Sequence, residues 1–200
     1  MTHLEALNQA LFLTLNGAPD SPWWRIAAAT VVADDLILLI PLLLLGLWFW
    51  GNDARRNVAL KACLVALLAL GLNQLIGLIW PHPRPFALGL GHTFIPHAAD
   101  SSFPSDHMTV FASIGIALFL GREKPLGTLV LLVSLSVAWA RIYLGVHFPL
   151  DMLGAVAVSG ISQAVVTPFW ARVGDQTTRL ALRLYRTLFA WPIATGWIRR

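Results

Sequence analysis

Long runs of apolar residues dominate the sequence and are separated by short polar segments. A helix needs about 20 residues to cross the ~30 Å hydrocarbon core of a membrane. Five segments approach or reach this length: residues 36–50 with those just before them, 62–80, 105–121, 125–143 and 149–171. Residues 1–16 indicate a shorter amphipathic helix at the surface. The pattern predicts an all-α integral membrane bundle of about five transmembrane helices, with interfacial helices at both ends of the chain.

The composition supports a membrane protein. Hydrophobic residues make up 57% of the chain and charged residues 12%, against an average charged share of ~25%. This excludes a disordered chain, which needs low hydrophobicity and high charge. We found no internal repeat and no low-complexity linker, so residues 1–200 are interpreted as one domain. The single cysteine, Cys63, cannot form an intrachain disulfide, and we expect it to be a buried apolar side chain.

Basic residues predict the orientation of the bundle. With five spans, eleven of the fourteen Lys and Arg residues fall on one face: Arg55, Arg56, Lys61, Arg122, Lys124, Arg172, Arg179, Arg183, Arg186, Arg199 and Arg200. An excess of Lys and Arg is typical of cytoplasmic loops. The net charge of +4 therefore indicates a membrane surface rather than nucleic acid as the partner.

Residues 172–200 are interpreted as a basic amphipathic cytoplasmic tail. Arg179, Arg183 and Arg186 form one helical stripe, and leucines cover another face. A helix of this kind usually lies in the membrane interface. The alternative, a sixth crossing, would bury three arginines at about 2.5–3.5 kcal/mol each.

Polar residues gather on the opposite face, in the loop 81–104 and in the link 140–151. Five of the six histidines lie between residues 82 and 147. Arg84 and Arg141 supply planar donors suited to phosphate oxygens. Ser105 precedes an apolar run and follows a proline, which is the pattern of a helix N-cap, and a helix N-terminus favours an anion. Together these residues predict a phosphate site.

Two histidines and a carboxylate provide the candidate chemistry. His147 and Asp151 are four residues apart, so one helical turn places the carboxylate beside the imidazole and fixes its tautomer. His147 is then the candidate nucleophile and His107 the general acid of a phosphoryl transfer. We expect no metal ion and no other cofactor. Each of these features also has a purely structural interpretation. The His147–Asp151 pair could be a structural hydrogen bond, residues 104–107 could be a capped helix start, and Arg84 could be an interfacial anchor.

Asp34 and Asp35 precede the uncharged stretch 36–50. One interpretation is that Asp35 caps a helix that starts at Leu36 and bends at Pro41. The alternative is that one of the two carboxylates faces the site, as an accessory residue that pairs with Arg84 or with a motif histidine.

The order of these residues resembles the type-2 phosphatidic acid phosphatase superfamily. Its motifs are Lys-x6-Arg-Pro, Pro-Ser-Gly-His and Ser-Arg-x5-His-x3-Asp. This sequence has Arg84-Pro85, then residues 104–107 as Pro-Ser-Asp-His, then Arg141-x5-His147-x3-Asp151. The resemblance implies His147 as nucleophile, Asp151 as its partner, His107 as general acid, and as phosphate ligands Arg84, Ser105 and Arg141.

Three positions depart from these motifs. The lysine position is Gly77, the glycine of the second motif is Asp106, and the serine of the third is Ala140. A missing lysine removes one phosphate contact, which His82 or His97 could partly replace. Asp106 adds a negative charge near the phosphate, and it would point away, pair with an arginine or cap the helix.

Residues 97–107 and 143–151 also resemble the bacterial undecaprenyl-diphosphatases of the bacitracin-resistance type. This implies conversion of undecaprenyl diphosphate to undecaprenyl phosphate through a phosphohistidine, which recycles the lipid carrier of cell-wall synthesis. The site would face the periplasm from the bacterial inner membrane. Two alternatives stay open: a phosphatase for phosphatidylglycerol phosphate, phosphatidic acid or lipid A, or a protein that binds or transports a lipid phosphate without hydrolysis. The oligomeric state is not predicted.

Overall fold

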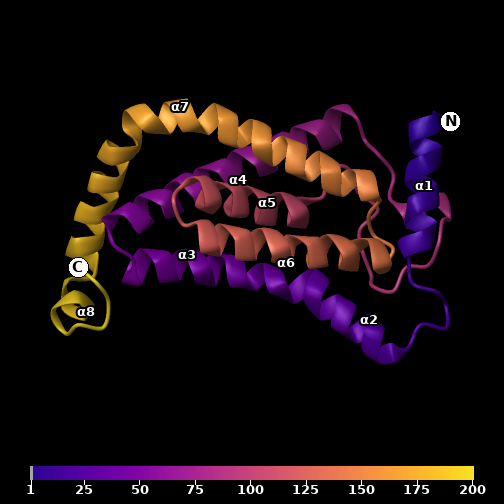
Figure 1. Ribbon diagram of the computed structural model, residues 1–200, viewed down its shortest axis with the longest axis horizontal. Helices are drawn as coiled ribbons and strands as arrows, with labels where there is room; N and C mark the ends of the chain where they lie inside the picture. The colour runs from indigo at the N-terminus through magenta and orange to yellow at the C-terminus, as the bar shows by residue number, and fades with distance from the viewer. Residues whose placement is uncertain (1) are drawn as a thin grey trace.

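The computed structural model describes residues 2–200 and has no β-strand within that range. Five long helical segments run side by side along the long axis (Figure 1). The first combines α2 (Trp23–Thr30), the π-helical η1 (Val31–Asp35), the 3-10 helix η2 (Leu36–Leu38) and α3 (Leu39–Trp50). The others are α4 (Asp53–Ile79), α5 (Asp106–Leu120), α6 (Lys124–Tyr143) and α7 (Pro149–Leu188). Shorter helices are α1 (His3–Leu15), η3 (Pro85–Leu88) and α8 (Ala190–Ala194).

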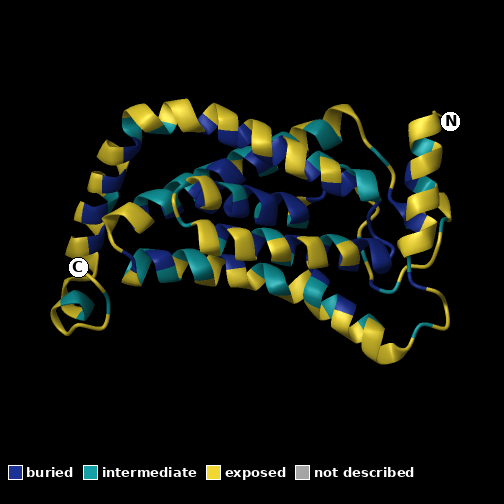
Figure 2. Cartoon of the chain, in the orientation of Figure 1, coloured by how far each residue is buried: buried dark blue, intermediate teal, exposed yellow. Residues whose placement is uncertain are grey.

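The predicted all-α membrane bundle is confirmed, although one of its helices is shorter than a full crossing. Four segments are long and apolar enough to span a membrane: Trp23–Trp50, α4, α6 and α7. Helix α5 has 15 residues and is therefore about 22 Å long. It is packed among α4, α6 and α7, with its inward face buried (Figure 2). Because neighbouring helices and the loop 81–105 surround it, α5 can begin inside the bundle rather than at the surface.

The first span differs from its prediction. Its helix starts at Trp23 instead of Leu36 and continues through the two acidic residues to Trp50. Asp35 has helical dihedral angles and makes no capping hydrogen bond. The prediction that Asp35 caps a helix is therefore wrong, because an N-cap residue must lie outside the helix that it caps.

Helices α5 and α6 pack closely against each other, and small residues allow this approach. A Cβ atom on Gly127 of α6 would lie 2.6 Å from the Cα atom of Phe119 and 2.8 Å from the carbonyl oxygen of Gly115, both in α5. Both contacts are to backbone, which cannot rotate away as a side chain could. Membrane helices often use small residues at such crossings.

The two ends of the bundle carry different helices. Helix α1 lies across one end, and the C-terminal part of α7, beyond Pro168, bends and runs across the other end (Figure 1). The α3–α4 turn, the α5–α6 turn and the basic part of α7 share this second end, as the positive charges predicted. The tail is continuous with α7 and lies across the bundle axis. Its place in a membrane interface stays a prediction.

Arg56, which the sequence marked only as one of the basic residues of this face, anchors the C-terminal residues to this end. Its side chain is fully buried, and it donates to the carbonyl oxygens of Trp48 (2.8 Å) and Arg199 (2.6 Å). The guanidinium also lies over the ring of Tyr185, 4.7 Å from the ring centre. A buried arginine needs such partners, so the end of the chain is part of the folded structure.

Substitution of Gly127 by alanine tests the α5–α6 contact. We expect Gly127→Ala to destabilise the protein by about 1–3 kcal/mol or more, because the added methyl group meets backbone. Thermal unfolding of the detergent-solubilised variant measures this. The matched control is Gly71→Ala in α4, where a Cβ atom has no neighbour within 4 Å. Equal melting temperatures for the two variants would contradict the proposed close approach.

Candidate active site

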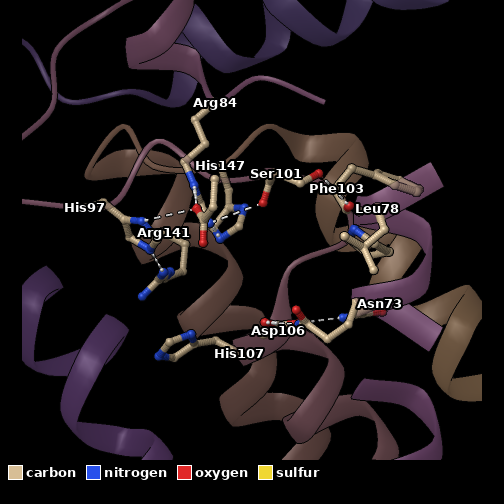
Figure 3. A pocket seen from close by; sticks show the side chains of 14 residues that line it. Asn73, Leu78, Arg84, His97, Ser101, Phe103, Asp106, His107, Arg141 and His147 are labelled. Atoms are coloured by element: carbon tan, nitrogen blue, oxygen red, sulfur yellow. Dashed lines mark hydrogen bonds and ion pairs between the residues drawn. The ribbon is translucent and has the colours of Figure 1, made fainter. Parts of the chain in front are cut away.

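A cavity of about 380 Å³ opens at the α1 end of the bundle. Its walls come from the end of α4, the start of α5, the loop 81–104 and the end of α6 with the link that follows it. Figure 3 shows the side chains converging from these segments. Most of the predicted site residues line it: Arg84, His97, Asp106, His107, Arg141 and His147. The topology thus brings all three sequence motifs to one place.

His147 and Asp151 form the predicted pair. His147 lies in the α6–α7 link and Asp151 in the first turn of α7, and both are buried. Nδ1 of His147 is 3.2 Å from Oδ2 of Asp151 and 3.0 Å from the carbonyl oxygen of Ser102. The backbone N–H of Phe148 donates to the same carboxylate oxygen at 2.8 Å. The carboxylate is therefore held in place on one side of the imidazole.

The other nitrogen of the His147 ring faces Arg84. Nε2 lies 3.2 Å from Nη1 of Arg84. A guanidinium can only donate, so Nε2 accepts and the ring proton resides on Nδ1, toward Asp151. Burial, followed by the positive charges of Arg84 and Arg141, lowers the pKa of His147 well below its ordinary value. The ring is therefore neutral at physiological pH, and Nε2 has the lone pair that a nucleophile needs.

Arg84 is buried, and most of its guanidinium N–H groups have partners in the protein. Its Nε donates to Oδ1 of Asp100 at 2.8 Å, and its Nη1 donates to the carbonyl oxygen of Val146, also at 2.8 Å. Partial burial alone would raise the pKa of Asp100, but the hydrogen bond and charge of Arg84 outweigh this and lower the pKa of that carboxyl. The geometry favours the phosphate-binding prediction for Arg84 over the interfacial anchor, since the guanidinium lines the cavity.

Arg141 projects from the last turn of α6 and is also buried. Nη1 donates to Oδ1 of Asp34 at 2.8 Å, and Nη2 lies 3.0 Å from Nε2 of His97. Burial and the nearby guanidiniums lower the pKa of His97, so it accepts this hydrogen bond as a neutral ring. Of the two carboxylates considered, Asp34 and not the accessory candidate Asp35 approaches the site, and its partner is Arg141 rather than the predicted Arg84 or a motif histidine.

His107 and Ser105 lie at the start of α5. The ring of His107 lines the cavity below Arg141 and His147 (Figure 3) and has no hydrogen-bond partner among residues 2–200. Ser105 occupies the predicted N-cap position, but its hydroxyl does not cap the helix. This hydroxyl is buried and unpartnered within the described chain. His107 is therefore free to interact with a ligand in the cavity, whereas Ser105 is buried and is not among the residues that line it. The catalytic role of His107 and the phosphate-binding role of Ser105 remain proposals.

Asp106 points across the helix interface. Its carboxylate oxygens accept from Nδ2 of Asn73 at 2.8 Å and from Nε2 of Gln74 at 3.2 Å, both in α4. The Asp106 side chain therefore neither turns out of the cavity nor pairs with an arginine, because its carboxylate oxygens accept hydrogen bonds from these two amides. Gly77, at the lysine position, faces Ser101, and a Cβ atom there would lie 3.3 Å from the Cβ of Ser101. The missing lysine thus coincides with close packing of α4 against the loop.

The two histidines proposed to replace that lysine separate in the structure. His97 lines the cavity, whereas His82 packs against Trp80 and Phe148 and approaches Glu5 of α1 at 4.0 Å. His82 is not among the cavity-lining residues, because aromatic neighbours hold its ring. Among residues 2–200, no three His, Cys, Asp or Glu side chains are grouped closely enough to hold a metal ion.

Sequence reasoning missed Ser102. This fully buried serine donates a short hydrogen bond from its hydroxyl to Oδ2 of Asp151, and its carbonyl oxygen accepts from His147. It lies two residues before Pro104, inside the polar loop, but no motif marks it. A serine hydroxyl can form hydrogen bonds with many kinds of group, so the sequence alone does not identify Asp151 as its partner.

These features define a multi-pass membrane protein with an arginine-rich, histidine-containing cavity that suits phosphate chemistry. The pattern of the PAP2 superfamily matches residues 58–175, and the chain belongs to this family. The resemblance seen in the motifs is therefore confirmed.

Individual relatives agree with this assignment. The chain is 39% identical over 196 residues to a putative undecaprenyl-diphosphatase, YbjG, from Escherichia coli, covering 98% of this chain and 99% of the relative. It is 35% identical to the undecaprenyl-diphosphatase BcrC from Bacillus subtilis, covering 76% and 79% of the two chains. The crystal structure of LpxE from Aquifex aeolicus has a similar fold, with a TM-score of 0.66 and 25% identity over 80% of this chain and 94% of that one.

Removal of the Ser102 hydroxyl tests how the His147–Asp151 pair is held. A hydrogen bond to a charged group contributes about 1.5–3 kcal/mol. We therefore expect Ser102→Ala to lower kcat at least about 10-fold. KM should change little because Ser102 does not line the cavity. Steady-state kinetics measure both. The control is Ser113→Ala, which removes a buried hydrogen bond to Ser159 (3.0 Å) in the bundle core and should leave kcat unchanged. Unchanged kcat in Ser102→Ala would exclude a supporting role.

Proposed function

We propose that this protein is a phosphatase that converts undecaprenyl diphosphate to undecaprenyl phosphate through a phosphohistidine. The observation that carries the proposal is the position of His147. Its neutral Nε2 lies at the cavity wall beside Arg84, while a buried carboxylate holds its other nitrogen. The diphosphate substrate is supported by the relatives, two of which are named for this activity.

In the first step, Nε2 of His147 attacks the terminal phosphorus of the diphosphate. The bond from this phosphorus to the bridging oxygen breaks as the bond to nitrogen forms. Arg84 and Arg141 hold the oxygens of the transferred group, since guanidinium groups stabilise charge spread over such oxygens. His107 donates a proton to the bridging oxygen as it leaves with the lipid phosphate. The negative charge of the bound diphosphate favours the protonated imidazole that this step needs.

In the second step, water attacks the phosphorus of the phosphohistidine. His107, now neutral, accepts a proton from this water, and the bond from phosphorus to Nε2 breaks. Inorganic phosphate leaves and His107 is again protonated, so the cycle closes. Asp151 stabilises the positive charge on the His147 ring while the phosphorus is attached.

The lipid part of the substrate reaches the cavity along α4. Leu78 lines the cavity and is also 82% exposed on the outside of the bundle. The neighbouring Ile79 and Trp80 are 74% and 59% exposed. The cavity therefore meets an apolar outer surface, which suits a polyprenyl chain that stays in the bilayer while its diphosphate enters.

The site lies at the end of the bundle opposite the one where eleven of the fourteen Lys and Arg residues gather. Because Lys and Arg concentrate in cytoplasmic segments, we assign the site to the extracytoplasmic face and the tail 172–200 to the cytoplasm of a bacterial inner membrane. This orientation suits an enzyme that recycles a carrier after its cargo has been used outside the cytoplasm. Labelling of single cysteines placed at the two ends tests it independently of activity.

A substrate comparison tests the proposed function. Purified protein in detergent is given undecaprenyl diphosphate, farnesyl diphosphate, phosphatidylglycerol phosphate and phosphatidic acid, and phosphate release is measured. We expect the prenyl diphosphates to be preferred and His147→Ala to lose release while still binding substrate within a few-fold, because only the nucleophile is removed.

The outcomes separate the alternatives. Preference for the glycerolipids would keep the catalytic residues and overturn the substrate. Binding without release by folded wild-type protein would favour a lipid-phosphate binder or transporter. Equal turnover in His147→Ala would exclude His147 as the nucleophile. The control is His92→Ala, a loop histidine on the same face that does not line the cavity.

A further inference from the structure

Asp34 is a charged residue within the first membrane-spanning segment, outside residues 58–175 that the family pattern matches. A carboxylate inside such a segment is costly and usually has a functional reason. Its Oδ1 lies 2.8 Å from Nη1 of Arg141. Arg141 lines the cavity and Asp34 does not. Any effect of Asp34 on a bound phosphate must therefore act through Arg141.

The local backbone brings Asp34 to this arginine. Asp34 lies in η1, the π-helical turn of Val31–Asp35, which changes the direction in which the residues of the helix point. Ala33 in the same turn and Ala29 about one turn earlier are buried in one hydrophobic cluster with Ala140 of α6. Small residues on both helices allow a close approach. Ala140, which replaces the serine of the third motif, thus fits the contact that supports the Asp34–Arg141 pair.

The surroundings of Arg141 leave part of its guanidinium for a ligand. The side chain is 2% exposed, so each N–H needs a partner. Asp34 binds Nη1 and His97 binds Nη2. Nε is buried and has no partner among residues 2–200. Two contacts therefore fix the plane of the guanidinium, and the group keeps unused capacity to donate to phosphate oxygens.

We infer that Asp34 is a positioning residue, which holds Arg141 in the orientation needed to donate to the transferred phosphoryl group. This inference rests on the proposed phosphatase function but concerns a residue that none of the motifs includes. Correct orientation matters most when charge redistributes in the transition state, so loss of Asp34 should lower kcat more than it raises KM.

Asp35 provides a matched control. It is the next residue in the same helix and carries the same charge, but within residues 2–200 its side chain forms no ion pair or hydrogen bond. We expect Asp34→Asn to lower kcat for undecaprenyl diphosphate about 10-fold, with KM within about 3-fold, since a charged hydrogen bond becomes a neutral one. Asp35→Asn should resemble the wild type. Asp34→Glu, which keeps the carboxylate, should lie between the two.

A coupling measurement does not depend on the lipid substrate. Binding of inorganic phosphate is measured by its effect on the melting temperature in wild type, Asp34→Asn, Arg141→Gln and the double variant. We expect Arg141→Gln to weaken phosphate binding about 10-fold in the wild-type background and less than about 3-fold in the Asp34→Asn background. The effect is smaller in the Asp34→Asn background because Arg141 has already lost the contact that orients it.

The results distinguish the two proposals. If wild-type protein releases no phosphate from undecaprenyl diphosphate but the coupling is found, the substrate proposal fails and the positioning role stands. Additive effects of the two substitutions would overturn the positioning role, and so would equal kcat values for Asp34→Asn and Asp35→Asn. Tighter phosphate binding in Asp34→Asn without loss of kcat would show that Asp34 only neutralises the positive charge of Arg141, which would also contradict the positioning role. If Asp34→Asn does not fold, wild-type kcat in folded Asp34→Glu would likewise contradict the role.

Discussion

Two guanidinium groups buried in an apolar bundle are the constraint on which the site depends. Removal of an arginine from water costs several kcal/mol unless carboxylates and carbonyl oxygens replace the lost solvent. For Arg84 these partners are Asp100 and the carbonyl oxygen of Val146, and for Arg141 they are Asp34 and His97. The partners come from the first span, the loop 81–104 and the α6–α7 link. These segments must converge at one end of the bundle if the two arginines are to be satisfied, and the same convergence forms the cavity.

The helix packing makes this convergence possible. Helix α5 begins inside the bundle and ends near its basic end, so its N-terminus and His107 lie at cavity depth rather than at the surface. The glycines of the α5–α6 contact set the position of α5, and α7 begins directly beside it with Asp151 in its first turn. The charged tail and Arg56 occupy the opposite end. One bundle thus separates the end that forms the cavity from the end at which most of its basic residues gather.

The sequence was sufficient to predict the all-helical membrane bundle, the end at which most basic residues gather and the motif residues that line the cavity, because hydrophobic length and motif spacing depend on local chemistry. It was insufficient where side-chain direction decided the outcome. Asp34 and Asp35 are adjacent residues of the same type, so the sequence does not show which carboxylate pairs with an arginine. The π-helical turn determines that Asp34 reaches Arg141. Ser102 acts through a hydroxyl and a carbonyl group that any loop serine has. The sequence places His82 near the missing lysine, but only the fold shows that Trp80 and Phe148 hold its ring outside the cavity.

The central claim is that His147 carries the phosphoryl group between the two steps. The most direct test is rapid quenching of the enzyme during turnover of undecaprenyl diphosphate labelled in its terminal phosphate, followed by peptide mapping under alkaline conditions that preserve phosphohistidine. The account predicts label on His147 that is stable to alkali and lost in acid, and that persists longer in His107→Ala because the attacking water then lacks its base. Label on another residue, or no labelled enzyme while phosphate is released at the normal rate, would contradict it.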